Sequence, residues 1–297
     1  MIDKVIKFGG TSVGSEAGLR RVLAITTIEV AEKRNIVIVV SAFSGVTNML
    51  IHSVLLAARG KKYLDNLQVI RERHMNIIKH FFPKERQKKL ANTMSTMCRD
   101  SFKRLKKIKD NKRYTKKDID ALASCGERFS AYIIMELLNC QGIKSQYVDG
   151  RDIIQTDSAY MKAKVNYKAT ENKIKKYWKN IKGVPVVTGF IAADKKKQTT
   201  TMGRGTSDYT AAILGAALQA KVIEIWTDVD GLYSADPKKK KKAKLIEKIN
   251  YAQAIKMAKA GAKVLHPLTM VPAQKKNIPI IIKNTYNFQS PGTIICN

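Results

Sequence analysis

The chain has 297 residues, and its 55 lysines and arginines exceed its 24 aspartates and glutamates enough to give a formal net charge of +31. No apolar run reaches the ~18–20 residues of a membrane-spanning helix, and the N-terminus lacks the apolar segment of a secretory signal, so we expect a cytoplasmic protein without a membrane partner. The four cysteines and four histidines show neither C-x-x-C nor H-E-x-x-H spacing, which argues against a disulfide framework, structural zinc and a histidine metal site.

The positive charge is compatible with several classes of anionic partner. Nucleic acid, an anionic surface and small polyanionic substrates would all be attracted by it. The lysine tracts at 103–109 and 238–242 are not interleaved with aromatic residues that stack on bases, and no zinc-finger, helix-turn-helix or RNP pattern is present. We therefore interpret most of the charge as solvated surface and do not expect a nucleic-acid partner.

The first predicted element is a strand that runs through Lys7 into the loop Gly9-Gly10-Thr11-Ser12. Glycines can adopt left-handed angles and approach a ligand closely, so backbone N–H groups here could surround a phosphate. A helix beginning near Ser15 would direct its positive end at that anion, and Asn35 would end it before a strand over 36–40. The loop is not a Walker A motif, because Ser15 stands where that motif has lysine. Taken alone, the loop could equally serve only to reverse the chain.

The middle of the chain alternates helices and strands. A loop over 41–48 leads into a helix from 49 to 58, and a basic, helix-periodic segment over 61–111 is expected to be a helical insertion lying over the sheet. Another helix follows Thr115. Further strands are predicted over 146–148, 184–188, 222–226 and 278–282, several of them continuous apolar runs typical of strands covered on both faces. The pattern predicts a three-layer α/β/α sandwich with a mainly parallel sheet.

A second candidate site lies at Gly203-Arg204-Gly205, just before Ser207, Asp208 and a helix predicted over 209–218. An arginine between two glycines is suited to binding a carboxylate or phosphate through its planar fork. The loop follows a strand end, which is where open α/β sheets bind ligands. In the alternative interpretation, Ser207 or Asp208 only caps the helix.

Two later segments are also candidates. Thr227 and Asp228 end the strand over 222–226, and Tyr233 follows after a turn, so these side chains could hydrogen-bond to or stack on a nucleotide. As isolated turn residues they would be unremarkable. Lys263 comes just past a predicted helix, where it could simply complement the helix dipole.

Taken in order, these motifs resemble the aspartokinase family within the amino-acid kinase superfamily. The resemblance also includes Ser41-Ala42, Thr47-Asn48, Gly126-Glu127 and Asp236-Pro237, and it covers essentially the whole chain. It implies a fold similar to carbamate kinase and the phosphorylation of L-aspartate by ATP with Mg²⁺. The product would be 4-phospho-L-aspartate, the first intermediate on the way to lysine, threonine and methionine.

The resemblance also implies residue roles. Lys7 would contact the β- and γ-phosphates, Asp208 would orient Lys7, and Arg204 would hold a carboxylate of the amino acid. The other amino-acid-binding residues would be Ser41, Thr47, Glu127, which would pair with the ammonium, and Ser207. The other nucleotide-binding residues would be Phe8, Gly9, Gly10, Ser12, Thr227, Asp228, Tyr233, Lys238, Lys263 and Val264. No metal site on the protein is expected. From the sequence alone, Glu127 could equally be a surface charge and Thr47 a helix cap.

We expect one catalytic domain over 1–297, with a substrate-binding lobe to about 200 and a nucleotide-binding lobe from about 201. Thr206, Lys238 and Cys125 replace the glycine, arginine and histidine usual in the family, so we expect reduced efficiency at most. Family members usually continue beyond the segment that matches Pro291-Gly292-Thr293 into effector-binding domains, whereas this sequence stops at Asn297. We therefore expect no C-terminal regulatory domain and no feedback inhibition. A homodimer is compatible with the sequence. Two alternatives stay open: another carboxylate kinase of the superfamily, or an inactive kinase fold with a basic surface that binds nucleic acid.

Overall fold

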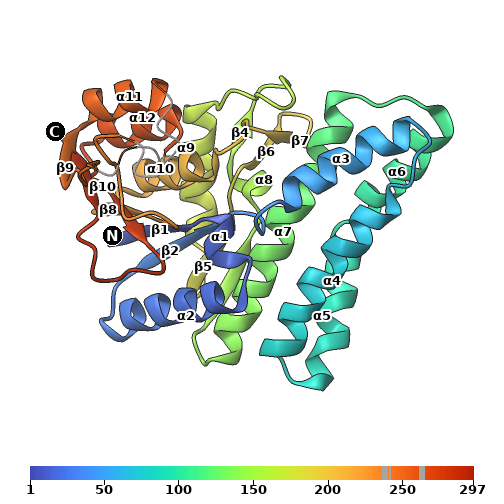
Figure 1. The fold of residues 1–297 in the computed structure, drawn as a ribbon, viewed down its shortest axis with the longest axis horizontal. Helices are drawn as coiled ribbons and strands as arrows, with labels where there is room; N and C mark the ends of the chain where they lie inside the picture. The colour runs from blue at the N-terminus through green and yellow to red at the C-terminus, as the bar shows by residue number, and fades with distance from the viewer. Residues whose placement is uncertain (236–239, 241, 261–264) are drawn as a thin grey trace.

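A mostly parallel sheet of eight strands forms the centre of the structure, a computed structural model that describes residues 1–235, 240, 242–260 and 265–297. The strand order is β3-β5-β2-β1-β8-β10-β11-β9, and among the described strand pairs of this sheet only β10–β11 is antiparallel (Figure 1). In that order the strands span Ser145–Val148, Val184–Thr188, Ile36–Val40, Lys4–Phe8, Val222–Thr227, Ile280–Asn284, Thr293–Cys296 and Lys248–Asn250. A second sheet contains β4 (Gln155–Thr156), β6 (Ile191–Asp194) and β7 (Thr199–Thr201).

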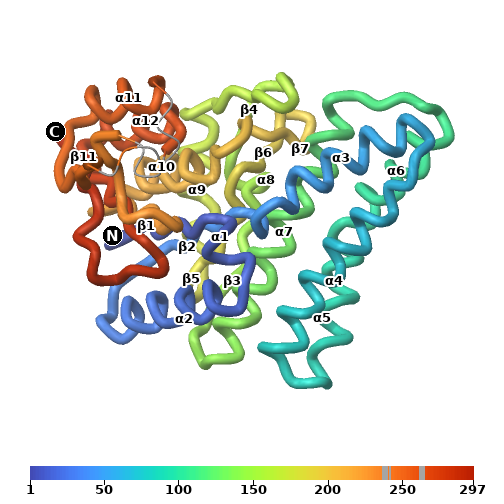
Figure 2. The backbone as a smooth tube through the Cα atoms, in the orientation of Figure 1, coloured from blue at the N-terminus to red at the C-terminus, as the bar shows by residue number. Residues whose placement is uncertain are grey.

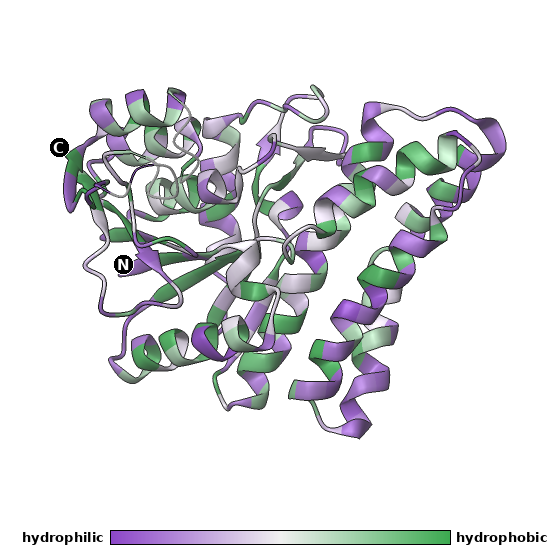
Figure 3. Ribbon diagram, viewed as in Figure 1, coloured by the Kyte–Doolittle hydropathy of each residue, from purple (hydrophilic) through white to green (hydrophobic). Residues whose placement is uncertain are grey.

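Helices cover both faces of the main sheet, because its strands are apolar on both sides (Figure 3). In β1, Ile6 and Phe8 pack with α2 (Glu16–Ala31) and α7 (Lys116–Cys140), whereas Val5 packs with α10 (Ser207–Leu218) on the opposite face. This alternation confirms the predicted α/β fold. The remaining helices are α1 (Gly10–Val13), α3 (Val46–Ala58), α4 (Leu64–Phe81), α5 (Lys84–Met97), α6 (Arg99–Asn111), α8 (Gly150–Ile153), α9 (Tyr167–Trp178), α11 (Tyr251–Lys259) and α12 (Pro267–Lys275).

The boundaries agree best where the sequence is a continuous apolar run. Strands β2 and β5 have the predicted limits, and Thr115 begins α7 with a capping box that also uses Asp118. Two predictions were wrong: α3 begins at Val46 and not at 49, and β10 begins two residues later than expected. The helix predicted to begin near Ser15 is confirmed as α2, but the short helix α1 before it was missed. The second sheet was missed, because its strands have only two to four residues.

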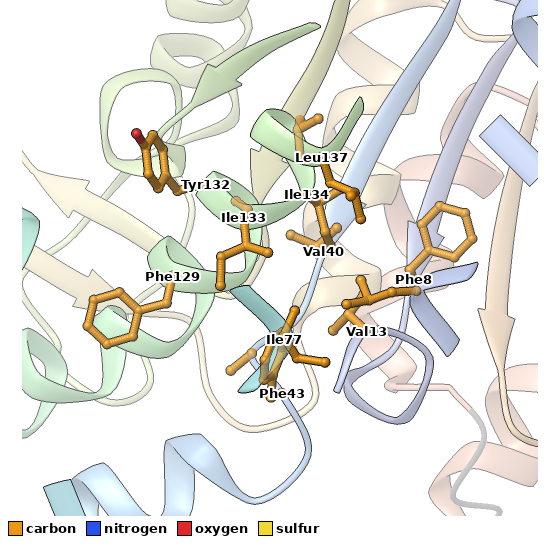
Figure 4. Close-up of a cluster of buried hydrophobic side chains, with 14 of the residues drawn as sticks. Phe8, Val13, Val40, Phe43, Ile77, Phe129, Tyr132, Ile133, Ile134 and Leu137 are labelled. Atoms are coloured by element: carbon orange, nitrogen blue, oxygen red, sulfur yellow. The ribbon is translucent and has the colours of Figure 1, made fainter. Parts of the chain in front are cut away.

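The insertion forms helices α4, α5 and α6, which extend to one side of the sheet (Figures 1 and 2). It packs on α3 and α7, so the prediction that it lies over the sheet was wrong. Its apolar residues face those helices: Ile77 of α4 joins Phe43 and Phe129 in the core cluster that also contains Phe8 and Val40 (Figure 4). No helix in the described part of the chain is long and apolar enough to cross a membrane.

Candidate active site

The site begins at the carboxyl end of β1, where Lys7 faces the α10 side of the sheet. Side chains alternate along a strand, so Lys7 shares the face of Val5 and opposes that of Phe8. The Lys7 ammonium lies 2.6 Å from the Oδ1 atom of Asp208, in the first turn of α10, and both residues are buried. The ion pair fixes a cation between residues that are far apart in the sequence.

The glycine loop after β1 is built differently from our expectation. Gly9 has φ −72° and Gly10 is helical, so neither uses a left-handed backbone. The need at Gly10 is for space: a Cβ there would lie 2.6 Å from the carbonyl oxygen of Ala42. The Gly9 N–H donates to the carbonyl oxygen of Trp226, so it is not available to a phosphate.

The first turn of α1 supplies the backbone donors instead. This helix has no side-chain cap, and Val13 is the first residue whose N–H bonds back to Gly9, so the N–H groups of Gly10, Thr11 and Ser12 have no helical partner. The Ser12 hydroxyl is fully buried and shares a hydrogen bond of 2.7 Å with Thr285. An anion near Lys7 would therefore meet backbone donors more readily than this hydroxyl.

The start of α10 is also uncapped, which contradicts the capping interpretation of Ser207 and Asp208. Thr206 occupies the N-cap position, but its hydroxyl donates to the carbonyl oxygen of Gly203 and not to the helix. Asp208 pairs with Lys7. The helix therefore presents free N–H groups beside a buried cation, which is an arrangement suited to phosphate.

The second half of the site is a buried carboxylate, Glu127 on α7. It is 4% exposed; its Oε1 atom lies 3.5 Å from the Thr47 hydroxyl, and its Oε2 atom has no partner among the described residues. Burial raises the pKa of Glu127 to about 8, although hydrogen bonds from the Ala42 backbone and Thr47 act in the opposite direction. Both local interpretations were wrong: Glu127 is not a surface charge, and Gly45, not Thr47, is the N-cap of α3.

One short loop joins the two halves. Ala42 touches Gly10 through its carbonyl oxygen and Gly126 through its Cβ, at 2.6 and 2.7 Å from the Cβ positions that those glycines lack. The carbonyl oxygen of Ser41 accepts from the Ser130 hydroxyl at 2.7 Å, which ties the same loop to α7. The Lys7 region and the Glu127 region are therefore neighbours across this loop.

Arg204 is exposed, in a loop whose flanking residues Gly203 and Gly205 have φ +103° and +73°. In the described part of the chain it makes no ion pair or hydrogen bond with the rest of the site. Ser207 is buried and packs closely on Gly189: a Cβ added to Gly189 would lie 2.6 Å from the Cβ of Ser207.

The predicted nucleotide residues lie beside β1 only in part. Thr227 ends β8, the strand next to β1, and Asp228 follows it, with 3.2 Å between the Thr227 hydroxyl and the Asp228 carboxylate. The Tyr233 hydroxyl donates to Asp230 at 3.1 Å. Phe8 is fully buried in the core on the opposite face from Lys7, so its side chain is not available to a nucleotide. Lys238, Lys263, Val264 and the Asp236-Pro237 pair lie outside the described residues.

A model of the amino acid kinase family matches residues 4–284. The chain belongs to the amino acid kinase family.

Aspartokinases are among the relatives of this chain. It is 34% identical to bifunctional aspartokinase/homoserine dehydrogenase 2 of Arabidopsis thaliana over 98% of this chain and 32% of the relative. It is 31% identical to lysine-sensitive aspartokinase 3 of Escherichia coli, over 99% of this chain and 64% of that protein. The structure of E. coli aspartokinase III in complex with aspartate and ADP (R-state) matches with a TM-score of 0.86 at 31% identity, covering 99% of this chain and 64% of that chain.

The form of that enzyme in complex with lysine and aspartate (T-state) matches with a TM-score of 0.78 at 30% identity, covering 99% of this chain and 65% of that one. The resemblance expected from the motifs is confirmed. The chain spans about a third of the length of the first curated relatives, at 32%.

Two residues beside the predicted nucleotide-binding residues were missed from the sequence. Asp230 accepts hydrogen bonds from Asn284 at 2.8 Å, Asn287 at 3.0 Å and Tyr233, so it joins the end of β8 to the end of β10. Thr285 pairs with Ser12. Asp230 stands within the same polar stretch as Thr227 and Asp228, which was the available signal, whereas nothing near Thr285 in the sequence indicated its partner.

Proposed function

We propose that this chain transfers a phosphoryl group from ATP to the β-carboxylate of L-aspartate, giving 4-phospho-L-aspartate for amino-acid biosynthesis. The observation that carries the proposal is that two buried charged side chains, Lys7 and Glu127, lie on either side of the Ser41–Ala42 loop. One suits the phosphates of a nucleotide, and the other suits the ammonium of an amino acid. The relative that matches with aspartate and ADP bound supports both assignments.

The phosphate side of the mechanism is electrostatic. Lys7 and the free N–H groups of α1 and α10 would contact the phosphates and stabilise charge on the transferred group, while Asp208 holds the ammonium in place. A single pair of unit charges ~4 Å apart is worth about 4 kcal/mol at an effective dielectric of 20. A few fixed cationic groups can therefore offset the repulsion between the two anionic substrates.

The amino-acid side needs no general base, because the β-carboxylate is already a nucleophile. Glu127 would pair with the substrate ammonium, Thr47 would assist, and Arg204, which is exposed in its glycine-flanked loop, would bind the α-carboxylate. Ser41 and Ser207 would line the same pocket. Burial raises the pKa of Glu127, and the positive charge of a bound ammonium would lower it again, so that the carboxylate form is favoured in the complex.

Mg²⁺ would enter with ATP. Among the described residues no group of three His, Cys, Asp or Glu side chains could hold an ion alone, so the nucleotide phosphates would supply most of its ligands. Bound Mg²⁺ would neutralise phosphate charge. Asp228, exposed just past the end of β8, makes no ion pair among the described residues and would be available to that ion.

The test is to trap the acyl phosphate with hydroxylamine while offering aspartate, glutamate, N-acetylglutamate or carbamate with MgATP. We expect hydroxamate from aspartate only. A preference for another acceptor would identify a different carboxylate kinase, and no ATP turnover with any acceptor would favour an inactive fold. Adding lysine or threonine to the same assay tests the prediction that this chain is not feedback-inhibited. Light scattering tests the proposed homodimer.

A further inference from the structure

The helical insertion contains a cavity that the proposed function does not use. Its volume is about 310 Å³, and it lies among α4, α5, α6 and α7. Its wall is mostly apolar and buried or half-buried, whereas Arg71, Asn92 and Ser95 are exposed. The apolar lining residues are Leu67, Ile70, Met75, Ala91, Met94, Phe102 and Phe129. An apolar interior with a few polar groups is typical of small-molecule sites.

One buried polar group in this wall has no partner. His74 is 1% exposed, and its Nδ1 atom lies 2.7 Å from the carbonyl oxygen of Ile70, so Nδ1 carries the proton and donates. Nε2 is then an acceptor, and it has no hydrogen-bond partner in the described residues. Burial lowers the pKa of His74 to about 4, so the ring is neutral near pH 7. An unpaired buried acceptor is costly, and a donor brought by a ligand would remove that cost.

The same histidine packs on two residues that lie next to the proposed amino-acid site. Its ring stacks on Phe43 with centroids 4.3 Å apart and an angle of 5°, and it meets Phe129 edge-on at 5.3 Å. Phe43 follows Ala42 in the Ser41–Ala42 loop, and Phe129 is two residues after Glu127; both belong to the cluster in Figure 4. The neighbouring Arg73 donates to the carbonyl oxygen of Ser44 at 2.8 Å. Helix α4 therefore contacts the residues after Ala42 at two points, through His74 on Phe43 and through Arg73 on Ser44.

We propose that this cavity is a second ligand site, which binds a small aromatic or branched aliphatic molecule whose single O–H or N–H group donates to Nε2 of His74. The apolar part of the ligand displaces water from the apolar residues that line the cavity, and its donor forms a hydrogen bond with Nε2 of His74. Occupancy changes how firmly His74 holds Phe43 and Phe129. Binding therefore alters the affinity for the amino acid and not for the nucleotide; this second part rests on the proposed function.

The site is tested by direct binding, measured by ligand-observed NMR with phenol and toluene as probes. The two have similar rings, but only phenol has a donor. We expect saturable binding of phenol at least tenfold tighter than that of toluene. His74→Phe keeps an aromatic ring against Phe43 and removes Nε2, so it should abolish the preference; Ala91→Trp, which fills the cavity, should abolish binding of both probes.

Equal affinity of phenol and toluene for the native protein, or no saturable binding of either, would overturn the site. This comparison decides the question even where His74→Phe does not fold, because it needs no variant. The coupling is tested by the KM for aspartate at saturating phenol, which should change at least threefold while the KM for MgATP stays constant. An unchanged KM for aspartate would overturn the coupling, whereas a complete lack of kinase activity would contradict the proposed function and leave the binding result intact.

Discussion

At the scale of single residues, variants of the ion pair between Lys7 and Asp208 should affect catalysis and stability differently. Lys7→Met should reduce kcat by about 10²–10³-fold, the usual loss when a fixed electrostatic donor is removed. It should also destabilise the fold by about 3–5 kcal/mol, because Asp208 becomes an unpaired buried charge. The double variant Lys7→Met/Asp208→Asn should recover most of the stability and none of the activity. Steady-state kinetics and urea unfolding measure the two effects.

Near-native turnover by the Lys7→Met variant would show that Lys7 does not act on the phosphates. Lys7→Arg is the matched control, since it keeps the charge but changes its shape and reach. It should unfold like the native protein and retain part of the activity. Equal losses in the Met and Arg variants would mean that the site needs the lysine geometry and not only a cation.

Glu127 predicts a pH dependence that belongs to amino-acid binding. Its pKa is raised to about 8, so in the free protein the carboxyl is largely protonated below that pH, and binding an ammonium requires loss of the proton. The KM for aspartate should therefore fall as the pH rises from about 6.5 to about 8.5. Glu127→Gln should raise this KM and make it independent of pH over that range. A KM that rises with pH in the native protein would contradict the assignment.

The same shift has a consequence for stability, with a defined sign. A carboxyl whose folded pKa lies above its unfolded value binds more protons in the folded state between about 4.5 and 8. Its contribution is complete below pH 4.5 and is lost as the pH rises through about 8. The free energy of unfolding of Glu127→Gln should thus fall less between pH 6 and pH 9 than that of the native protein.

At the scale of elements, Asp120 joins α7 to the strand that leads to Arg204. It lies two helical turns before Glu127 and is fully buried. Its carboxylate accepts from the N–H of Met161 at 2.9 Å, and from the N–H and hydroxyl of Thr201 at 2.9 and 2.7 Å. Burial raises the pKa of this carboxyl. The contact therefore sets the position of the end of β7 relative to Glu127.

Asp120→Ala leaves the N–H groups of Met161 and Thr201 without their acceptor, so β7 should shift away from α7. We expect the KM for aspartate to rise about tenfold, ~1.4 kcal/mol, with the KM for MgATP unchanged. Asp194→Ala is the control: Asp194 accepts from the N–H groups of Lys196 and Gln198 at the far end of the same β6–β7 hairpin. It should lose similar stability and leave both KM values within about twofold. Equal kinetic effects in the two variants would assign Asp120 a purely structural role.

Elements whose information is local were predictable, and contacts between distant segments were not. The apolar runs of β2 and β5 specify buried strands by themselves, and Lys7, Gly10 and Asp208 are recognisable from their motifs. The reason for Gly10 was missed, because it depends on the carbonyl oxygen of Ala42 and not on the backbone angles of the loop. Asp120 and Thr285 were missed for the same reason, since their partners lie 81 and 273 positions away.

At the scale of the whole molecule, one sheet runs through both of the lobes that the sequence predicts. β1 is hydrogen-bonded to β2 on one side and to β8, from the second half of the chain, on the other. The chain leaves β1 towards β2 and returns to the opposite side much later, which places a switch in strand order next to Lys7. Ligand sites of open α/β sheets lie at such points, which favours a ligand site beside Lys7.

This continuity predicts a single cooperative unfolding transition. Ile70 and Phe82 of the insertion belong to the same core cluster as Phe8, so the insertion should not unfold before the sheet. Both tryptophans, Trp178 and Trp226, lie outside the insertion, whereas far-UV circular dichroism includes its three helices. The urea midpoints of tryptophan fluorescence and of circular dichroism should therefore coincide. A lower midpoint by circular dichroism would show that α4 to α6 form a separate folding unit, and a ligand of the His74 cavity would then stabilise that unit and not the whole chain.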